Sequence, residues 1–148
     1  GNLRTGFSID LSLRIASLNP GQVLLDTRTP TGKGFALIVN EFGSIEIMLQ
    51  DGHTENHWAV DPGVIRANQC HHLTAIVDAG PHIISFVVDG VLCDGSTSRK
   101  YGWGRFSPQL RHVNGSETLA INSAVTSLRI YSRALLTGEA IANHRVLA

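Results

Sequence analysis

Apolar and polar residues alternate strictly near the start of the chain. Between Phe7 and Ile15, five apolar side chains alternate with four polar ones, and a period of two is typical of a strand with one buried face. Asp10 is placed to pair with Arg129 across neighbouring strands. We expect the apolar set (Phe7, Ile9, Leu11, Leu13, Ile15) to face an opposite sheet and the polar set (Ser8, Asp10, Ser12, Arg14) to face solvent.

Further apolar runs follow, and turn residues separate them. They predict strands at 22–27, 35–40, 44–50, 70–78, 82–88, 91–93, 119–122 and 125–131. Thr137 can cap a short helix from about Gly138 to His144. Short strands joined by hairpin turns predict an all-β fold, a two-sheet antiparallel β-sandwich of the jelly-roll type, as a single domain over residues 1–148.

Two segments lack the strand pattern and predict irregular loops, residues 51–69 and residues 94–118. Long irregular connections in compact domains often carry function. A sugar presents apolar C–H faces and a rim of hydroxyls, so a module that binds it needs an aromatic face beside planar polar groups. Each Trp has the alternative role of closing an end of the sandwich. The candidate carbohydrate-binding residues are His57, Trp58 and Asp61 on the first loop and Asp94, Arg99, Tyr101 and Trp103 on the second.

Composition narrows the range of partners. Apolar residues make up 43% of the chain and charged residues 16%, which predicts a compact folded unit. Twelve basic residues balance twelve acidic ones, whereas nucleic-acid-binding domains carry a basic excess. The sequence has no polybasic run and no apolar stretch long enough to cross a bilayer. We therefore expect neither nucleic acid nor a membrane as a partner.

The templates of common catalytic sites are absent from the sequence. It contains no G-x-S-x-G elbow, no P-loop, no dinucleotide glycine pattern and no H-E-x-x-H motif. Glycoside hydrolysis needs two carboxylates that converge on one bond, and no predicted strand carries such a set. The sequence therefore predicts a protein that is not an enzyme.

The cysteines and histidines leave several interpretations open. In a strand, Cys70 and His72 share one face while His71 points to the other, so only two of the three can meet one ion, and histidines with ordinary strand partners are favoured over a metal site. Acidic residues at 51, 55 and 61 allow a structural calcium but do not place it, and no cofactor is required. If residues 70–93 fold back on themselves, Cys70 and Cys93 form either a disulfide or a pair of buried free thiols.

The order of several segments carries a resemblance to a known family. Those segments are Phe7-Ser8-Ile9-Asp10-Leu11, Gly34-Phe35-Ala36-Leu37 with Gly43-Ser44-Ile45-Glu46, Gln69 to Asp78 around His71-His72, Phe86 to Val91 with its Val-Asp-Gly turn, and Ser127 to Leu135. Together they resemble the concanavalin A-like lectin/glucanase superfamily, and within it laminin-G-like jelly-roll modules. The resemblance implies a secreted or extracellular accessory module of the kind joined to glycoside hydrolases and sialidases.

Two departures from the family pattern bear on this expectation. Many members have Trp before the His pair, where this chain has Cys70, and many have one or two strands before the segment that matches Phe7. The second departure leaves open a fragment, or a sandwich that the rest of a larger protein completes. The expected partners are a glycan and an adjacent catalytic domain of the same chain. The alternative is a structural or protein-interaction domain, which would show an apolar patch and no polar-lined groove.

Overall fold

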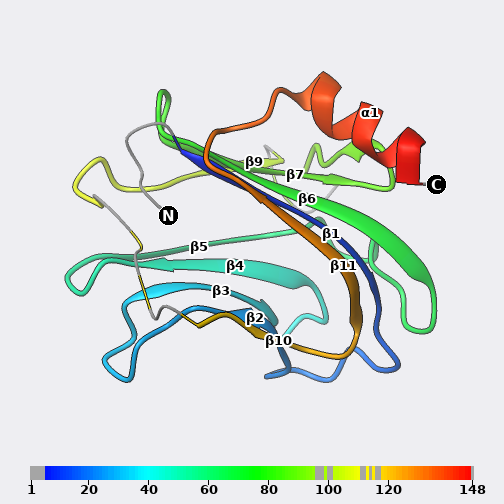
Figure 1. Cartoon of the computed structure of the whole chain (residues 1–148), viewed down its shortest axis with the longest axis horizontal. Helices are drawn as coiled ribbons and strands as arrows, with labels where there is room; N and C mark the ends of the chain where they lie inside the picture. The colour runs from blue at the N-terminus through cyan, green and yellow to red at the C-terminus, as the bar shows by residue number, and fades with distance from the viewer. Residues whose placement is uncertain are drawn as a thin grey trace.

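The computed structural model describes residues 6–95, 99, 102–110, 113, 115 and 118–147. In this part of the chain two antiparallel sheets pack face to face, and one helix lies on the outside of the larger sheet (Figure 1). The elements are β1 (Phe7–Arg14), β2 (Val23–Asp26), β3 (Gly34–Val39), β4 (Ile45–Gln50), β5 (Glu55–Ala59), β6 (Cys70–Asp78), β7 (Ile83–Val88), β8 (Val91–Leu92), β9 (Trp103–Arg105), β10 (Ala120–Ile121), β11 (Val125–Tyr131) and α1 (Thr137–Leu147). The predicted all-β sandwich with a short C-terminal helix is confirmed.

Each sheet draws its strands from distant parts of the sequence. The larger sheet has the order β11-β1-β6-β7-β8, with β9 also paired to β7, and the smaller sheet has the order β10-β2-β3-β4-β5. Among these elements the chain changes sheet between β1 and β2, between β5 and β6, between β9 and β10, and again between β10 and β11. The two long predicted hairpins, β3-β4 and β6-β7, are both present.

Alternating apolar residues form the core between the sheets. On β1 the predicted inward set is buried throughout, and on β4 the side chains of Ile45, Ile47 and Leu49 are inaccessible to solvent. The other face of β4 carries Glu46 and Met48, which are only partly buried. Full burial of such an aliphatic side chain contributes about 1.5–3 kcal/mol, so the alternation alone selects which face closes on the other sheet.

The outer face of β1 is covered, which the sequence pattern did not predict. Ser8 and Asp10 were expected to face solvent, and both are buried because α1 and the segment before it pack across the larger sheet (Figure 1). Leu135 and Ala140 contact Ile76 and Val87 in a second, smaller apolar cluster. The Ser8 hydroxyl donates to the Arg133 carbonyl and accepts from the Leu135 amide, each at 2.9 Å. Ser12 is partly buried and Arg14 is exposed.

A polar cluster joins this helix to the sheet. Asp10 and Arg129 are opposite each other in register, as expected, but the Asp10 carboxylate is bound elsewhere. Its Oδ1 lies 2.6 Å from His72 Nε2, and its Oδ2 accepts from Asn143 Nδ2 at 3.0 Å. The ring of His144 stacks on that of His72 with centroids 5.4 Å apart. Residues from β1, β6 and α1 therefore meet at one buried carboxylate.

Two strands lie within segments that were predicted to be loops. The prediction of an irregular loop at 51–69 is wrong for β5, which pairs with β4 along its whole length. The prediction for 94–118 is wrong for β9, which pairs with β7. Both are edge strands of mixed composition, and backbone pairing to a neighbour holds them in place without an apolar alternation.

The two cysteines are free thiols, and only Cys93 is buried. Residues 70–93 do fold back as the meander β6-β7-β8, but β7 separates the strands that Cys70 begins and Cys93 follows. Two strand spacings are about 9.6 Å, which exceeds the Cα separation that a disulfide spans. Burial raises the pKa of the Cys93 thiol above its ordinary value.

Candidate functional site

The turn between β3 and β4 displays an aromatic side chain to solvent. The Asn40 amide donates to the Ser44 carbonyl at 2.9 Å and closes the turn. The Asn40 Oδ1 accepts from the backbone amides of Phe42 and Ser44, both at 3.0 Å. Gly43 adopts a positive φ of 73°, where a residue without a side chain is favoured. Because the turn is held by its own hydrogen bonds, Phe42 is left 78% exposed at its tip.

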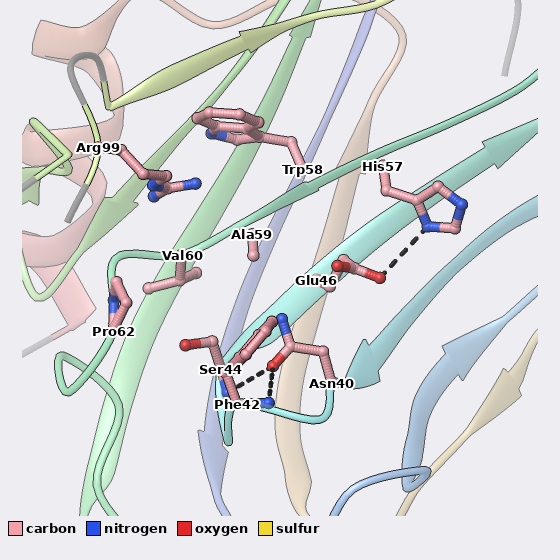
Figure 2. A pocket seen from close by; sticks show the side chains of 10 residues that line it. All are labelled: Asn40, Phe42, Ser44, Glu46, His57, Trp58, Ala59, Val60, Pro62 and Arg99. Atoms are coloured by element: carbon pink, nitrogen blue, oxygen red, sulfur yellow. Dashed lines mark hydrogen bonds and ion pairs between the residues drawn. The ribbon is translucent and has the colours of Figure 1, made fainter.

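A pocket of about 420 Å³ lies beside this turn. Figure 2 shows its side chains coming from the turn, from β4, from β5 and the residues after it, and from the distant Arg99. We call it the Phe42 pocket. Its volume is within the range of small-molecule sites, and its lining combines apolar groups with a few polar ones. The lining residues are Asn40, Phe42, Ser44, Glu46, His57, Trp58, Ala59, Val60, Pro62 and Arg99.

Trp58 and Arg99 form one end of the pocket. The guanidinium carbon of Arg99 lies 4.2 Å from the centre of the Trp58 ring, a cation–π contact. The indole nitrogen donates to the Gly102 carbonyl at 3.2 Å, and the ring also packs against the core. A Cβ at Gly104 would come within 2.2 Å of the indole. Trp58 therefore closes an edge of the sandwich, and the ring face under Arg99 is already occupied.

Asp61 ties the second predicted loop to the end of β5. Its carboxylate is only 4% exposed. It accepts from the backbone amides of Asp94 and Gly95 at 3.1 Å and from Arg99 Nη2 at 2.6 Å. The buried charge of Asp61 is thus paired and hydrogen-bonded, as a buried carboxylate must be. This contact holds Arg99 over Trp58.

His57 lies at the other side of the pocket between two carboxylates. Its Nδ1 is 3.2 Å from Glu46 Oε2 and its Nε2 is 3.5 Å from Glu55 Oε1. In Figure 2, Glu46 and His57 lie side by side on neighbouring strands, because both belong to the outer face of the smaller sheet. Glu46 lines the pocket, so a carboxylate acceptor faces whatever binds there.

Two polar atoms of the lining residues lack a partner among the described residues. The Ser44 hydroxyl is on a side chain that is only 3% exposed, and it makes no hydrogen bond. The Nε of Arg99 is also buried and unpartnered. A buried polar group without a partner costs about 1–3 kcal/mol. Both residues line the pocket, although these two atoms are themselves shielded from solvent.

The structure brings together residues from both predicted loops. His57 and Trp58 on β5 line the pocket with Arg99, whereas Asp61 and Asp94 are hydrogen-bonded to each other and do not line it. Trp103 is on β9, where the Arg105 guanidinium carbon is 5.7 Å from its ring centre, and it does not line the pocket. Tyr101 lies outside the described residues.

Sequence reasoning missed the residues that the turn contributes. Phe42 belongs to the connection between the predicted strands 35–40 and 44–50, Ser44 and Glu46 belong to the second of these strands, and none of the three was named as a candidate. The available signal was an aromatic residue at the tip of a tight turn, a place where apolar side chains cannot be buried by their own hairpin.

The neighbouring histidines His71 and His72 each lie within hydrogen-bonding distance of a carboxylate. His71 Nδ1 lies 2.6 Å from Asp89 Oδ2, and its Nε2 accepts from the Arg66 amide at 3.0 Å. His72 faces Asp10, as described above. In the part of the chain that the structure describes, no three His, Cys, Asp or Glu side chains are grouped so that they could hold a metal ion. The helix described here is too short and too polar to span a membrane.

Comparisons with known proteins agree with this architecture. A family model of the laminin G type, described as the concanavalin A-like lectin/glucanases superfamily, matches residues 2–142. No curated protein matched the sequence.

Several solved structures share the fold at low sequence identity. A sialidase carbohydrate-binding module (CBM40) from Ruminococcus gnavus, solved with α2,3-sialyllactose, has a TM-score of 0.68 at 15% identity over 95% of this chain and 83% of its own. The binding domain of botulinum neurotoxin DC, in complex with rat synaptotagmin II, has a TM-score of 0.76 at 13% identity over 100% of this chain and 37% of its own.

The leech intramolecular trans-sialidase, complexed with 2,7-anhydro-Neu5Ac, gives a TM-score of 0.67 at 16% identity. The match covers 93% of this chain and 23% of the trans-sialidase, so this chain is equivalent to one part of a larger protein there. Strand order, the helix on the outer face and the family match over nearly the whole sequence lead to one assignment. The chain belongs to the concanavalin A-like lectin/glucanases superfamily.

Proposed function

We propose that this protein is a non-catalytic carbohydrate-binding module and that the Phe42 pocket is its binding site. The observation that carries the proposal is an exposed aromatic ring beside a pocket whose lining residues include unpartnered buried polar atoms. The apolar face of a sugar would stack on Phe42. Its hydroxyls would bind Ser44, Glu46 and the Nε of Arg99.

The pocket is better explained by a small polar ligand than by a protein surface. A domain that only packs on its neighbour needs a flat apolar patch with few buried polar groups. The Phe42 pocket is concave and carries a hydroxyl, a carboxylate, an imidazole and a guanidinium. The sialidase module with bound sialyllactose gives the same fold a precedent for sugar binding.

The wider setting is part of the same proposal. We infer an accessory module of a larger, extracellular glycoside hydrolase or sialidase-type protein, with an adjacent catalytic domain as its second partner. The module needs no cofactor for binding, because every group assigned to the ligand is a side chain of this chain. Nucleic acid and membranes have no role in it.

Glycan binding by matched variants tests this site. We expect glycan-array screening to identify a ligand, and calorimetry to show that Phe42→Ala weakens its binding about tenfold or more. Leu136→Ala is the control, because Leu136 is 72% exposed beside the helix and far from the pocket in sequence. We expect this control to bind within about twofold of the parent. Absence of glycan binding, or equal binding by both variants, would contradict the proposal.

Ser44→Ala separates binding from folding. Removing a buried hydroxyl that has no partner should leave the free energy of unfolding unchanged or slightly raise it. The same change should weaken glycan binding, because the ligand loses a hydrogen bond. A variant that loses stability and keeps its affinity would show that Ser44 has a structural role only.

A further inference from the structure

The charges around the Phe42 pocket favour one chemical class of sugar. We propose, on the basis of the function proposed above, that the pocket binds an uncharged sugar residue through its hydroxyls and discriminates against a sugar that carries a carboxylate. Three features of the pocket support this: a cation that is already paired, a rim that carries excess negative charge, and a set of hydrogen-bonding groups that matches hydroxyls.

Arg99, a cationic side chain that lines the pocket, already forms an ion pair. Arg99 is the one cationic side chain among the described residues that line the pocket. Its Nη2 is 2.6 Å from Asp61, and its guanidinium lies over Trp58. Recruiting it for a ligand carboxylate would leave the buried Asp61 charge with only the backbone amides of Asp94 and Gly95, which is unfavourable. The unpartnered Nε adds one buried N–H donor, which suits a single hydroxyl oxygen.

The rim carries excess negative charge. Glu46 lines the pocket, and Glu55 lies beyond His57 on the same face. Among the lining residues Glu46 and Arg99 balance; Glu55 and Asp61 lie against His57 and Arg99 without lining the pocket, and adding them gives a formal sum of −2 with His57 counted as neutral. A protonated His57 still leaves −1. Repulsion between like charges at such close range changes Kd by about tenfold or more where the site is partly shielded from water.

The hydrogen-bonding groups match hydroxyls. The Ser44 hydroxyl can donate and accept, Glu46 can only accept, and the Nε of Arg99 can only donate. The Oδ1 of Asn40 accepts two hydrogen bonds within the turn, so its side chain offers a ligand the two N–H donors of Nδ2. A sugar hydroxyl donates to one neighbour and accepts from another, so it satisfies this mixed set. A ligand carboxylate only accepts and would face the Glu46 carboxylate with no hydrogen between them.

The proposed preference for uncharged sugars distinguishes this chain from the sialidase module that shares its fold. That module was solved with sialyllactose, and at 15% identity the likeness concerns the fold. The charges of the Phe42 pocket belong to this sequence, and they determine which sugars the pocket accepts.

The test uses pairs of glycans that differ by one acidic sugar. Calorimetry would compare neutral oligosaccharides, lactose among them, with their sialylated or uronic-acid counterparts, including α2,3-sialyllactose. We expect the neutral member of a pair that binds to have a Kd at least about tenfold lower. Glu46→Gln should narrow that ratio by removing a rim charge. Glu41→Gln removes the same charge from an exposed residue of the same turn that does not line the pocket, so it should leave the ratio unchanged.

The outcomes separate this inference from the proposed function. An acidic glycan that binds as tightly as its neutral counterpart, and that loses affinity in Phe42→Ala, overturns the charge inference and leaves the binding site in place. Equal narrowing by Glu46→Gln and Glu41→Gln also overturns it, because the effect would then be one of net charge. No binding by any glycan, or binding that is indifferent to Phe42→Ala, overturns the proposed function and this inference with it.

Discussion

Replacing Asp10 tests how strongly the helix is held to the sheet. Asp10 is 1% exposed and accepts two good hydrogen bonds, from His72 at 2.6 Å and from Asn143 at 3.0 Å, with a longer contact from Thr74 at 3.4 Å. Hydrogen bonds to a charged group contribute about 1.5–3 kcal/mol each. Asp10→Ala removes both and leaves the buried imidazole without its acceptor, so we expect a loss of about 3–5 kcal/mol.

The measurements are urea unfolding for the free energy and thermal unfolding for Tm, both at pH 7 and followed by tryptophan fluorescence. In a domain of this size each kcal/mol lowers Tm by about 2–4 °C, so Asp10→Ala should melt roughly 6–20 °C below the parent. Asp10→Asn keeps one acceptor and should fall between them. Glu41→Ala is the exposed control, expected within about 0.5 kcal/mol of the parent. A loss below about 1 kcal/mol for Asp10→Ala would refute the reasoning, because the buried carboxylate would then contribute no more than an exposed one.

Three further predictions concern other parts of the molecule. Gly104→Ala places a Cβ within 2.2 Å of Trp58, so it should cost about 1–3 kcal/mol and shift tryptophan emission; unchanged emission would count against it. In the native protein a thiol reagent should modify exposed Cys70 and spare Cys93, whose pKa is raised by burial; rapid modification of both would contradict this. The Arg133 side chain, then the Leu136 amide, lower the pKa of Glu139 to about 2 from 4.5. The ionised group therefore stabilises the fold above pH 4.5, and the Tm difference between the parent and Glu139→Gln should shrink as the pH falls from 4.5 to 2; a constant difference would exclude this linkage.

The sandwich could be predicted from the sequence because its signal is local. The alternation along β1 and β4 specifies which face is buried before any partner strand is known. The Asn40–Ser44 hairpin and the limits of β11 follow from turn residues and β-branched runs in the same way. The strand β5 was missed because Glu55, Asn56 and His57 carry no apolar alternation, and pairing with β4 supplies what composition does not.

The rest of the architecture depends on contacts between distant segments. The burial of Ser8 and Asp10 requires a helix that begins over a hundred residues later, and the strand alone indicated solvent. Likewise, Arg99 reaches Trp58 because Asp61 holds it there, and no spacing in the sequence encodes that meeting. Aromatic and planar polar residues could be named as candidates. Which of these candidates line a pocket depends on contacts between distant segments, which local sequence patterns do not show.

The turn that bears Phe42 is fastened by Asn40 alone, through bonds that begin and end within the turn itself. Its tip can therefore be exchanged without repacking the interior. A sequence that retains Asn40 and Gly43 but replaces residue 42 would keep the scaffold and, under the function proposed above, would acquire another ligand preference. The proposed selectivity would then be modular, and grafting this short segment between chains of the same architecture would re-target it.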